Sequence, residues 1–190
     1  LTTTQKEDIE KSDVKIYENF YIEQKLTNGS TVRFFKNRKD VDKVCLMKGR
    51  MPEKSGEIAV DRMYAENNSL EIGDWVKSGK KAFRITGLVA LSDYSALFQN
   101  NNDTMFDSVK FGVAIVTDKD FEVLNQVKLQ YNYAWVYDKK PETEKKEKKM
   151  AEDLMEDMTG VVTLESFVPQ FQNQSICFTG DDMGSDRAMM

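Results

Sequence analysis

The fold is decided between residues 49 and 89, which read GRMPEKSGEIAVDRMYAENNSLEIGDWVKSGKKAFRITGLV. Glycine and proline punctuate the first part of this stretch, which predicts a loop. A short apolar strand, a helix with an aspartate at its N-cap position and two further strands joined by a Gly-Lys turn follow. We expect these elements at Glu57–Val60, Arg62–Asn67 with Asp61 as its cap, Trp75–Lys77 and Ala82–Leu91.

The segment before this stretch predicts a short helix and a β-hairpin. Residues 5–12 are polar and compatible with a helix, and between Val14 and Leu26 apolar residues recur with the two-residue period of a strand. Asn28-Gly29 follows, and this dipeptide between two strand-like runs is a strong hairpin signal. The chain is therefore expected to return along Thr31–Phe35.

The segment after the stretch predicts further strands and one long helix. The helix is expected over Pro141–Met158, with an apolar stripe on one side and Gly160 as its C-cap. The other expected elements are a loop at Ser92–Asp107, strands at Phe111–Thr117, Leu129–Tyr137 and Val161–Leu164, and a short helix at Asp118–Leu124. This order predicts an α+β fold with mixed β-sheets and a few helices.

The composition limits the chemistry that this chain can carry. It contains no histidine, which excludes a Ser-His-Asp triad and a histidine-zinc site. Neither a GxxxxGK[ST] nor a GxGxxG nucleotide-binding loop is present. A net charge of −5 without a basic stripe argues against a nucleic-acid partner. We therefore expect no catalytic residue, no cofactor and no metal ion.

Two cysteines, Cys45 and Cys177, lie far apart in the sequence and form no metal-binding motif. Two separate buried thiols and one disulfide both fit this pattern, so the pairing of the two cysteines stays open. No window reaches the roughly 18 consecutive apolar residues of a membrane span.

Several motifs in residues 49–89 resemble the extracytoplasmic domain of FtsX/MacB-type ABC-transporter permeases. They are Gly49-Arg50-x-Pro52, Glu57-Ile58, Ala65 in the short helix, Leu70-x-Ile72-Gly73-Asp74 and Phe83-x-Ile85-x-Gly87. The matched stretch covers roughly a fifth of the chain. It departs from the family pattern at Asn68-Ser69, where Leu-Gly is frequent.

The resemblance implies that residues 1–190 are a single extracytoplasmic domain with two lobes. Lobe one, of the β-α-β type, would comprise residues 1–48 and 126–190, and the smaller, β-rich lobe two residues 49–125. Such a domain lies outside the cell membrane between two transmembrane helices of the same polypeptide, and the abrupt ends at Leu1 and Met190 fit a loop of this kind.

The resemblance also implies partners. A separate cytosolic subunit would bind and hydrolyse ATP, and a homodimeric permease is compatible with the family. The extracytoplasmic domain would then be non-catalytic: it would engage substrate or partner proteins and transmit the conformational change that ATP drives.

One loop is a candidate contact site for a partner. Tyr94, Leu97 and Phe98 are large apolar side chains in an otherwise polar loop. Exposed apolar residues on a loop can mark a protein contact, although a loop can also fold such residues inward.

Two acidic clusters allow another interpretation. Glu152, Asp153, Glu156 and Asp157 share one predicted helix, where they would form an exposed polar face or, alternatively, an acid/base or cation site. Asp181-Asp182-x-Gly184-x-Asp186 lacks the spacing and the terminal glutamate of an EF-hand calcium loop.

Two alternative functions stay open. One is a secreted or surface-anchored binding module for peptide or glycan, and the other is a hydrolase that uses two facing carboxylates in one cleft. The binding module would use an aromatic stripe that otherwise predicts a half-buried sheet face beneath the long helix. The stripe consists of Tyr131, Tyr133, Trp135 and Tyr137.

Overall fold

A computed structural model describes residues 1–100, 103–124 and 129–163, which form two compact units. Within these limits unit 1 consists of Leu1–Glu18 and residues 133–163, and unit 2 consists of residues 19–132. The sequence-based division differs, because it assigns residues 19–48 to lobe one. These residues lie in unit 2, because they contain two strands that pair with each other, and one of these two strands also pairs with the central strand at Phe111–Val116. The β-rich unit is also the larger one.

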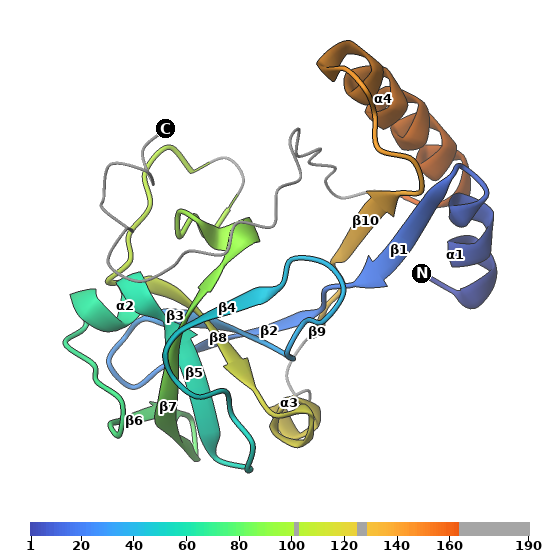
Figure 1. The fold of residues 1–190 in the computed structure, drawn as a ribbon. Helices are drawn as coiled ribbons and strands as arrows, with labels where there is room; N and C mark the ends of the chain where they lie inside the picture. The colour runs from blue at the N-terminus through green and yellow to red at the C-terminus, as the bar shows by residue number, and fades with distance from the viewer. Residues whose placement is uncertain (101–102, 125–128, 164–190) are drawn as a thin grey trace. The chain divides into compact units, whose positions relative to one another are not determined.

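Unit 1 is a two-stranded antiparallel sheet packed against two helices that lie side by side (Figure 1). Ile16 pairs with Trp135 in the register of the two strands. The elements are α1 (Thr3–Glu10), β1 (Val14–Glu18), β10 (Tyr133–Tyr137) and α4 (Glu144–Val161). The core consists of Ile9, Val14, Ile16, Leu154 and Met158.

Capping side chains begin both helices of unit 1. Thr2 and Gln5 form a capping box at α1, in which the backbone N–H of Thr2 donates to Oε1 of Gln5 at 2.8 Å. Thr143 caps α4, because its hydroxyl accepts from the backbone N–H of Lys146 at 3.3 Å. The long helix therefore begins three residues after Pro141, the start that the sequence predicts.

The end of α4 also corrects a prediction. Gly160 does not end the helix, which continues to Val161, where the backbone N–H of Val162 still donates to the carbonyl of Met158 at 2.8 Å. The strand expected at Val161–Leu164 therefore does not begin at Val161; Leu164 and the residues after it lie outside the described part of the chain.

Unit 2 is built on one mixed sheet of eight strands within the described residues. The strand order is β4-β7-β5-β8-β3-β2-β9, and β6 pairs with β7 beyond the end of β4. β3 is parallel to β8 and β5 to β7, whereas the other pairs are antiparallel. The strands are β2 (Tyr21–Lys25), β3 (Thr31–Phe35), β4 (Val44–Gly49), β5 (Glu57–Asp61), β6 (Trp75–Ser78), β7 (Lys81–Leu91), β8 (Phe111–Val116) and β9 (Leu129–Gln130). The predicted α+β class with mixed sheets is confirmed.

Three short helical segments complete unit 2: α2 (Arg62–Asn67), the 3₁₀ turn η1 (Ser92–Tyr94) and α3 (Asp118–Leu124). Asp61 caps α2 as expected, since its carboxylate accepts from the backbone N–H of Tyr64 at 3.1 Å. The ring of Tyr64 packs directly on Gly112, where a side chain would collide with it. A glycine in the central strand β8 thus lets α2 approach the sheet closely.

The aromatic stripe of the C-terminal strand divides between the two units. Tyr133, Trp135 and Tyr137 pack against the core of unit 1, as a half-buried sheet face should. Tyr131 lies outside β10, in unit 2, and its ring meets that of Phe20 edge to face with centroids 5.2 Å apart. The stripe is therefore shared between unit 1 and unit 2.

Candidate partner-binding surface

The three loop residues that the sequence predicts as a contact site have different positions. Leu97 is fully buried in the core of unit 2. Tyr94 is half-buried, and its ring packs against Phe35 and Phe111 with centroid separations of 5.7 and 6.3 Å. Phe98 is exposed. Of the three side chains, only that of Phe98 is exposed at the surface; a partner contact at this loop stays a prediction.

Phe98 belongs to a group of exposed apolar residues on the same loop. Its ring meets that of Phe106 edge to face, with centroids 5.8 Å apart, and Met105 is 83% exposed. Exposed Val109 follows near the end of the loop. We call Phe98, Met105, Phe106 and Val109 the 98–109 surface. Its last three members were not predicted; the Met105-Phe106 pair between polar residues is the signal that could have identified them.

Arg33 of β3 anchors the first end of this loop. Its Nη1 donates to the Tyr94 hydroxyl at 3.0 Å, and its Nη2 donates to the carbonyl oxygen of Gln99. On its other side Nε pairs with the Glu23 carboxylate at 2.8 Å. Burial raises the pKa of Tyr94 to about 12, so the phenol stays neutral and its oxygen stays available to this donor.

Aromatic rings enclose the same guanidinium. The central carbon of Arg33 lies 4.6 Å from the ring centre of Tyr21 and 5.0 Å from that of Phe111. Cation–π contacts of a largely desolvated arginine contribute on the order of 2 kcal/mol. The first end of the loop is therefore bonded to the Arg33 side chain, which residues of the sheet hold in place.

The C-terminal end of α2 anchors the second end of the loop. Asn67 donates to the Ser108 hydroxyl at 2.6 Å, and Asn68 donates to the backbone carbonyl of Val109 at 3.2 Å. Asp107 closes a turn, since its carboxylate accepts from the backbone N–H of Lys110 at 3.1 Å. This hydrogen bond lowers the pKa of Asp107. The 98–109 surface thus lies between two fixed ends.

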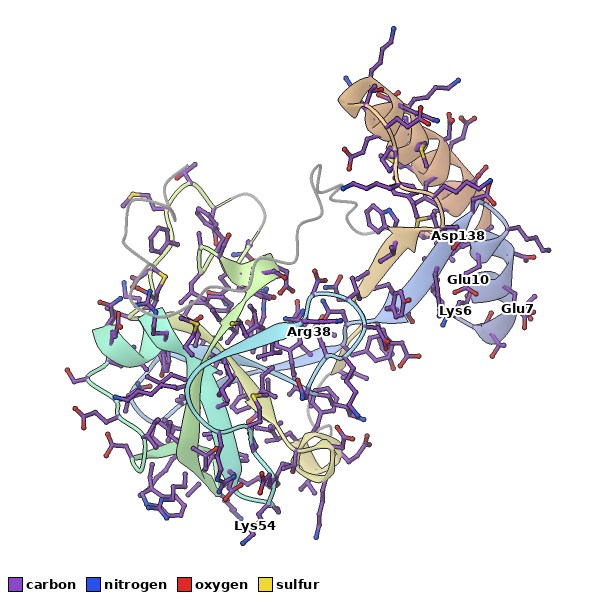
Figure 2. The ribbon with its side chains drawn as sticks, in the orientation of Figure 1. Lys6, Glu7, Glu10, Arg38, Lys54 and Asp138 are labelled. Carbon is purple, nitrogen blue, oxygen red and sulfur yellow. The ribbon has the colours of Figure 1, made fainter. Side chains whose placement is uncertain are left out.

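A buried ion pair holds the turn that opens the loop. Arg38, between β3 and β4 (Figure 2), donates through Nη1 and Nη2 to the two oxygens of Asp93 in η1, at 2.6 and 2.8 Å. Nη1 also donates to Oδ1 of Asn19 at 3.0 Å. Burial and the charge of Asp93 raise the pKa of nearby Asp42 to about 6. This cluster therefore holds one carboxyl group that titrates in mildly acidic solution.

The motifs of residues 49–89 have a structural explanation in unit 2. Arg50 pairs with both oxygens of Glu57, with Nη1 2.8 Å from Oε2, and Glu57 also accepts from the backbone N–H of Lys54 at 3.0 Å. Lys54 lies in the loop that precedes β5 (Figure 2). These hydrogen bonds, first that of Arg50, hold the pKa of Glu57 far below its usual range. The Gly-Arg-x-Pro loop and the Glu-Ile strand are thus joined by one ion pair.

Two glycines of the motifs also meet. Gly49 of β4 pairs with Gly87 of β7. A side chain on Gly49 would collide with the backbone of Thr86, and a side chain on Gly87 would collide with the backbone of Arg50. Gly49 has a φ of 78°, which only glycine adopts without strain. The glycines therefore serve close packing of two strands.

The other predicted candidates do not gather into a site. Glu152, Asp153, Glu156 and Asp157 are exposed on α4, and Asp157 accepts from the Ser12 hydroxyl at 2.7 Å. Within residues 1–100, 103–124 and 129–163 no group of three or more potential metal ligands occurs. Cys45 is half-buried on β4, while Cys177 and the acidic run at 181–186 lie outside the described residues. None of the helices described is both long and apolar enough to cross a membrane.

The comparisons with known proteins found structural neighbours only. No family model matches the sequence, and we find no match among curated proteins. The structure is similar to the extracellular domain of the noncanonic ABC-type transporter YknZ from Gram-positive bacteria, at 15% identity and a TM-score of 0.43, over 82% of this chain and 84% of that one. It is also similar to the periplasmic region of MacB from Actinobacillus actinomycetemcomitans, at 14% identity and a TM-score of 0.42, over 84% of this chain and 75% of that one.

Proposed function

We propose that this chain is the non-catalytic extracytoplasmic domain of an FtsX/MacB-type ABC-transporter permease, and that it engages a substrate or partner protein through the 98–109 surface. The exposed apolar residues of that loop are the observation that carries the proposal. ATP hydrolysis would take place on a separate cytosolic subunit, and transmembrane helices of the same polypeptide would connect the two.

The anchored ends of the loop support a binding role. Exposed phenylalanine and methionine side chains gain free energy when a partner removes them from water, by about 25 cal/mol per Å² of apolar surface. Residues that are already held in place lose less conformational entropy on binding than mobile ones. Arg33 fixes Tyr94 and Asn67 fixes Ser108, one on each side of the surface. Met105 between them is flexible enough to adapt to the contour of a partner.

The alternative of a peptide- or glycan-binding module has less support. It would use the aromatic stripe as an open platform, but Tyr133, Trp135 and Tyr137 pack against the core of unit 1. A stacking surface for sugar rings needs exposed aromatic faces. The described residues of β10 do not offer one.

The location can be tested by labelling with a membrane-impermeant maleimide. The native cysteines of the complete gene product are replaced by serine, and a single cysteine is introduced at exposed Lys119 on α3. We expect labelling on intact cells, or on spheroplasts if an outer membrane is present. Labelling that requires lysis of the inner membrane would overturn the proposed location.

The binding surface can be tested by photo-crosslinking in living cells. A photoreactive phenylalanine analogue replaces Met105 or, as a matched control, Val123, which is an exposed apolar residue on α3. We expect a protein adduct from position 105 alone, and its loss when Phe106→Ser is added. Equal adducts from both positions, or an adduct that Phe106→Ser does not affect, would contradict a role for this surface.

A further inference from the structure

The turn of the β2–β3 hairpin contains Asn28-Gly29, the only asparagine followed by glycine in the sequence. The backbone nitrogen after an asparagine can attack the side-chain amide, and glycine favours this attack because it has no side chain to shield that nitrogen. Asn28 is exposed, and a Cβ on Gly29 would meet no further atom of the described residues within 4 Å. The pair is therefore reactive by its sequence and accessible to water in the fold.

Four hydrogen bonds hold the Asn28 amide in the folded chain. Its Oδ1 accepts from the backbone N–H of Ser30 at 3.1 Å and from the Ser30 hydroxyl at 2.7 Å. Its Nδ2 donates to the Tyr64 hydroxyl at 3.2 Å and to Oδ1 of Asn68 at 3.3 Å. Both ends of the amide are thus bonded, and one of the partners, Tyr64, is completely buried.

We propose that Asn28 is a deamidation site that reacts when the hairpin turn opens, and that its conversion loosens the second end of the loop that carries the 98–109 surface. The backbone nitrogen of Gly29 loses its proton to water and attacks the side-chain carbonyl carbon of Asn28. Nδ2 gains a proton and leaves as ammonia, so that a cyclic imide forms. Water then opens the imide at one of its two carbonyl groups, which leaves aspartate or isoaspartate at position 28. One water molecule is consumed, one ammonia is released, and nothing is oxidised or reduced.

The folded turn slows this reaction. The backbone N–H of Gly29 donates to the carbonyl oxygen of Leu26 at 3.0 Å, so the attacking nitrogen is occupied. The Asn28 amide is held at the same time by its own four hydrogen bonds. The ring can close only after these hydrogen bonds have opened. The rate in the folded chain is therefore set by local opening of the turn.

Asn68 links position 28 to the loop. Its Oδ1 accepts from the Asn28 amide, and its Nδ2 donates to the backbone carbonyls of Ser108 and Val109 at 3.3 and 3.2 Å. A carboxylate at position 28 offers no donor to Oδ1 of Asn68 and repels it. The Asn68 amide can bond such a carboxylate only by turning over, and this movement withdraws Nδ2 from the two carbonyls. The inference does not depend on the proposed function, since it concerns only the chemistry of the turn and the attachment of the loop.

Mass spectrometry of the 190-residue chain measures the reaction in mildly alkaline buffer, with the chain folded or unfolded in urea. Cleavage after glutamate releases peptide 24–53, which contains Asn28 and, as an internal control, exposed Asn37 before Arg38. We expect Asn28 to react well before Asn37, with isoaspartate among the products. The folded chain should react at least about tenfold more slowly than the chain in urea, which corresponds to an opening free energy of about 1.4 kcal/mol or more.

Tyr64→Phe tests the protection by the fold, because it keeps the buried ring and removes the hydroxyl that accepts from the Asn28 amide. It should speed the reaction of the folded chain by about two- to tenfold, the range for one lost hydrogen bond, and leave the rate in urea unchanged. Equal rates in the folded and unfolded parent chain, or no product from the folded chain after prolonged incubation, would overturn the proposal. An unchanged folded rate in Tyr64→Phe would do the same.

Asn28→Asp reproduces the aspartate product and tests the link to the loop. Hydrogen exchange of residues 105–110 should become about two- to tenfold faster, as for the loss of one hydrogen bond, while residues 95–100 at the first end keep their rate. Thr27→Asp is the matched control, because it adds the same charge at an exposed neighbouring position of the turn. Unchanged exchange at residues 105–110, or an equal increase in Thr27→Asp, would contradict the loosening of the loop.

Discussion

The core of unit 1 holds five buried residues among those described, whereas the core of unit 2 holds 23. A small core makes each of its members a large share of the stability, since a buried aliphatic side chain contributes about 1.5–3 kcal/mol. A large core tolerates local features that cost free energy. Exposed Met105 and half-buried Asp42 are such features, and both lie in unit 2. The difference suggests that unit 2 can carry a binding loop and that unit 1 depends closely on its few internal contacts.

The largest expected loss comes from the core of unit 2. Phe34 is completely buried in β3, and its ring packs against Phe83 with centroids 5.9 Å apart. Phe34→Ala should lower the free energy of unfolding by about 3–5 kcal/mol, because the cavity closes only in part. Urea denaturation measures this loss, with the hydrogen exchange of a β3 peptide as the signal for unfolding of unit 2. A loss below about 1 kcal/mol would show that the core of unit 2 repacks more easily than its size suggests.

The matching change in unit 1 is Leu154→Ala on α4. Leu154 is 2% exposed in a five-residue core, and we expect a loss of about 2–5 kcal/mol that unfolds unit 1 while β3 stays protected from exchange. Met155→Ala on the exposed side of the same helix is the control and should change stability by less than about 0.5 kcal/mol. If β1 and β3 peptides lose protection together in Leu154→Ala, the two units do not unfold separately.

Local signals in the sequence predicted much of unit 2. The helix over Arg62–Asn67, its Asp61 cap and the return strand Thr31–Phe35 have the expected bounds, because capping and hairpin turns depend on residues close together in the chain. β4 was missed, since its residues show no clear alternation and it pairs with β7 only through contacts distant in sequence. The two units also differ from the expected lobes for the same reason.

The candidate surface shows the same limit. Phe98 is exposed and Leu97 is buried, although the two are adjacent in one loop. Nothing in their local sequence distinguishes them, because the loop is positioned by Arg33, which precedes Leu97 by 64 residues. A loop that is fixed by distant partners cannot have its exposed side predicted from its own residues.

A smaller effect is expected when the loop loses its anchor. Arg33→Lys keeps the positive charge but cannot bond Tyr94, Gln99 and Glu23 together, because lysine lacks the planar group with several donors. Local opening of residues 95–100 should become easier by about 1–3 kcal/mol, as for hydrogen bonds to charged groups. Hydrogen exchange of that segment measures the change, with Arg84→Lys at an exposed position of β7 as the control. Unchanged exchange would mean that buried Leu97 alone holds the loop.

The smallest expected effect is a gain in stability, and it comes from Asp42. The pKa of Asp42 is raised to about 6 in the folded chain, so the folded state binds the proton more tightly than the unfolded state, in which an aspartate has a pKa of about 3.9. Stability therefore falls as the pH rises from about 4 to about 6, and above that range the charged carboxylate beside Asp93 destabilises unit 2. Asp42→Asn removes the charge and keeps a residue type that accepts the φ of 47°.

At pH 7.5 we expect Asp42→Asn to raise the free energy of unfolding by about 1 kcal/mol, a value reduced for partial exposure to solvent. The gain should disappear at pH 4, where Asp42 is protonated in the folded chain and only partly ionised in the unfolded one. Asp61 has a pKa of about 6 as well, so only the difference between variant and parent isolates Asp42. Asp40→Asn, at an exposed neighbouring position, should give no such gain. A loss of stability at pH 7.5 would mean instead that the negative charge of Asp42 helps to hold Arg38.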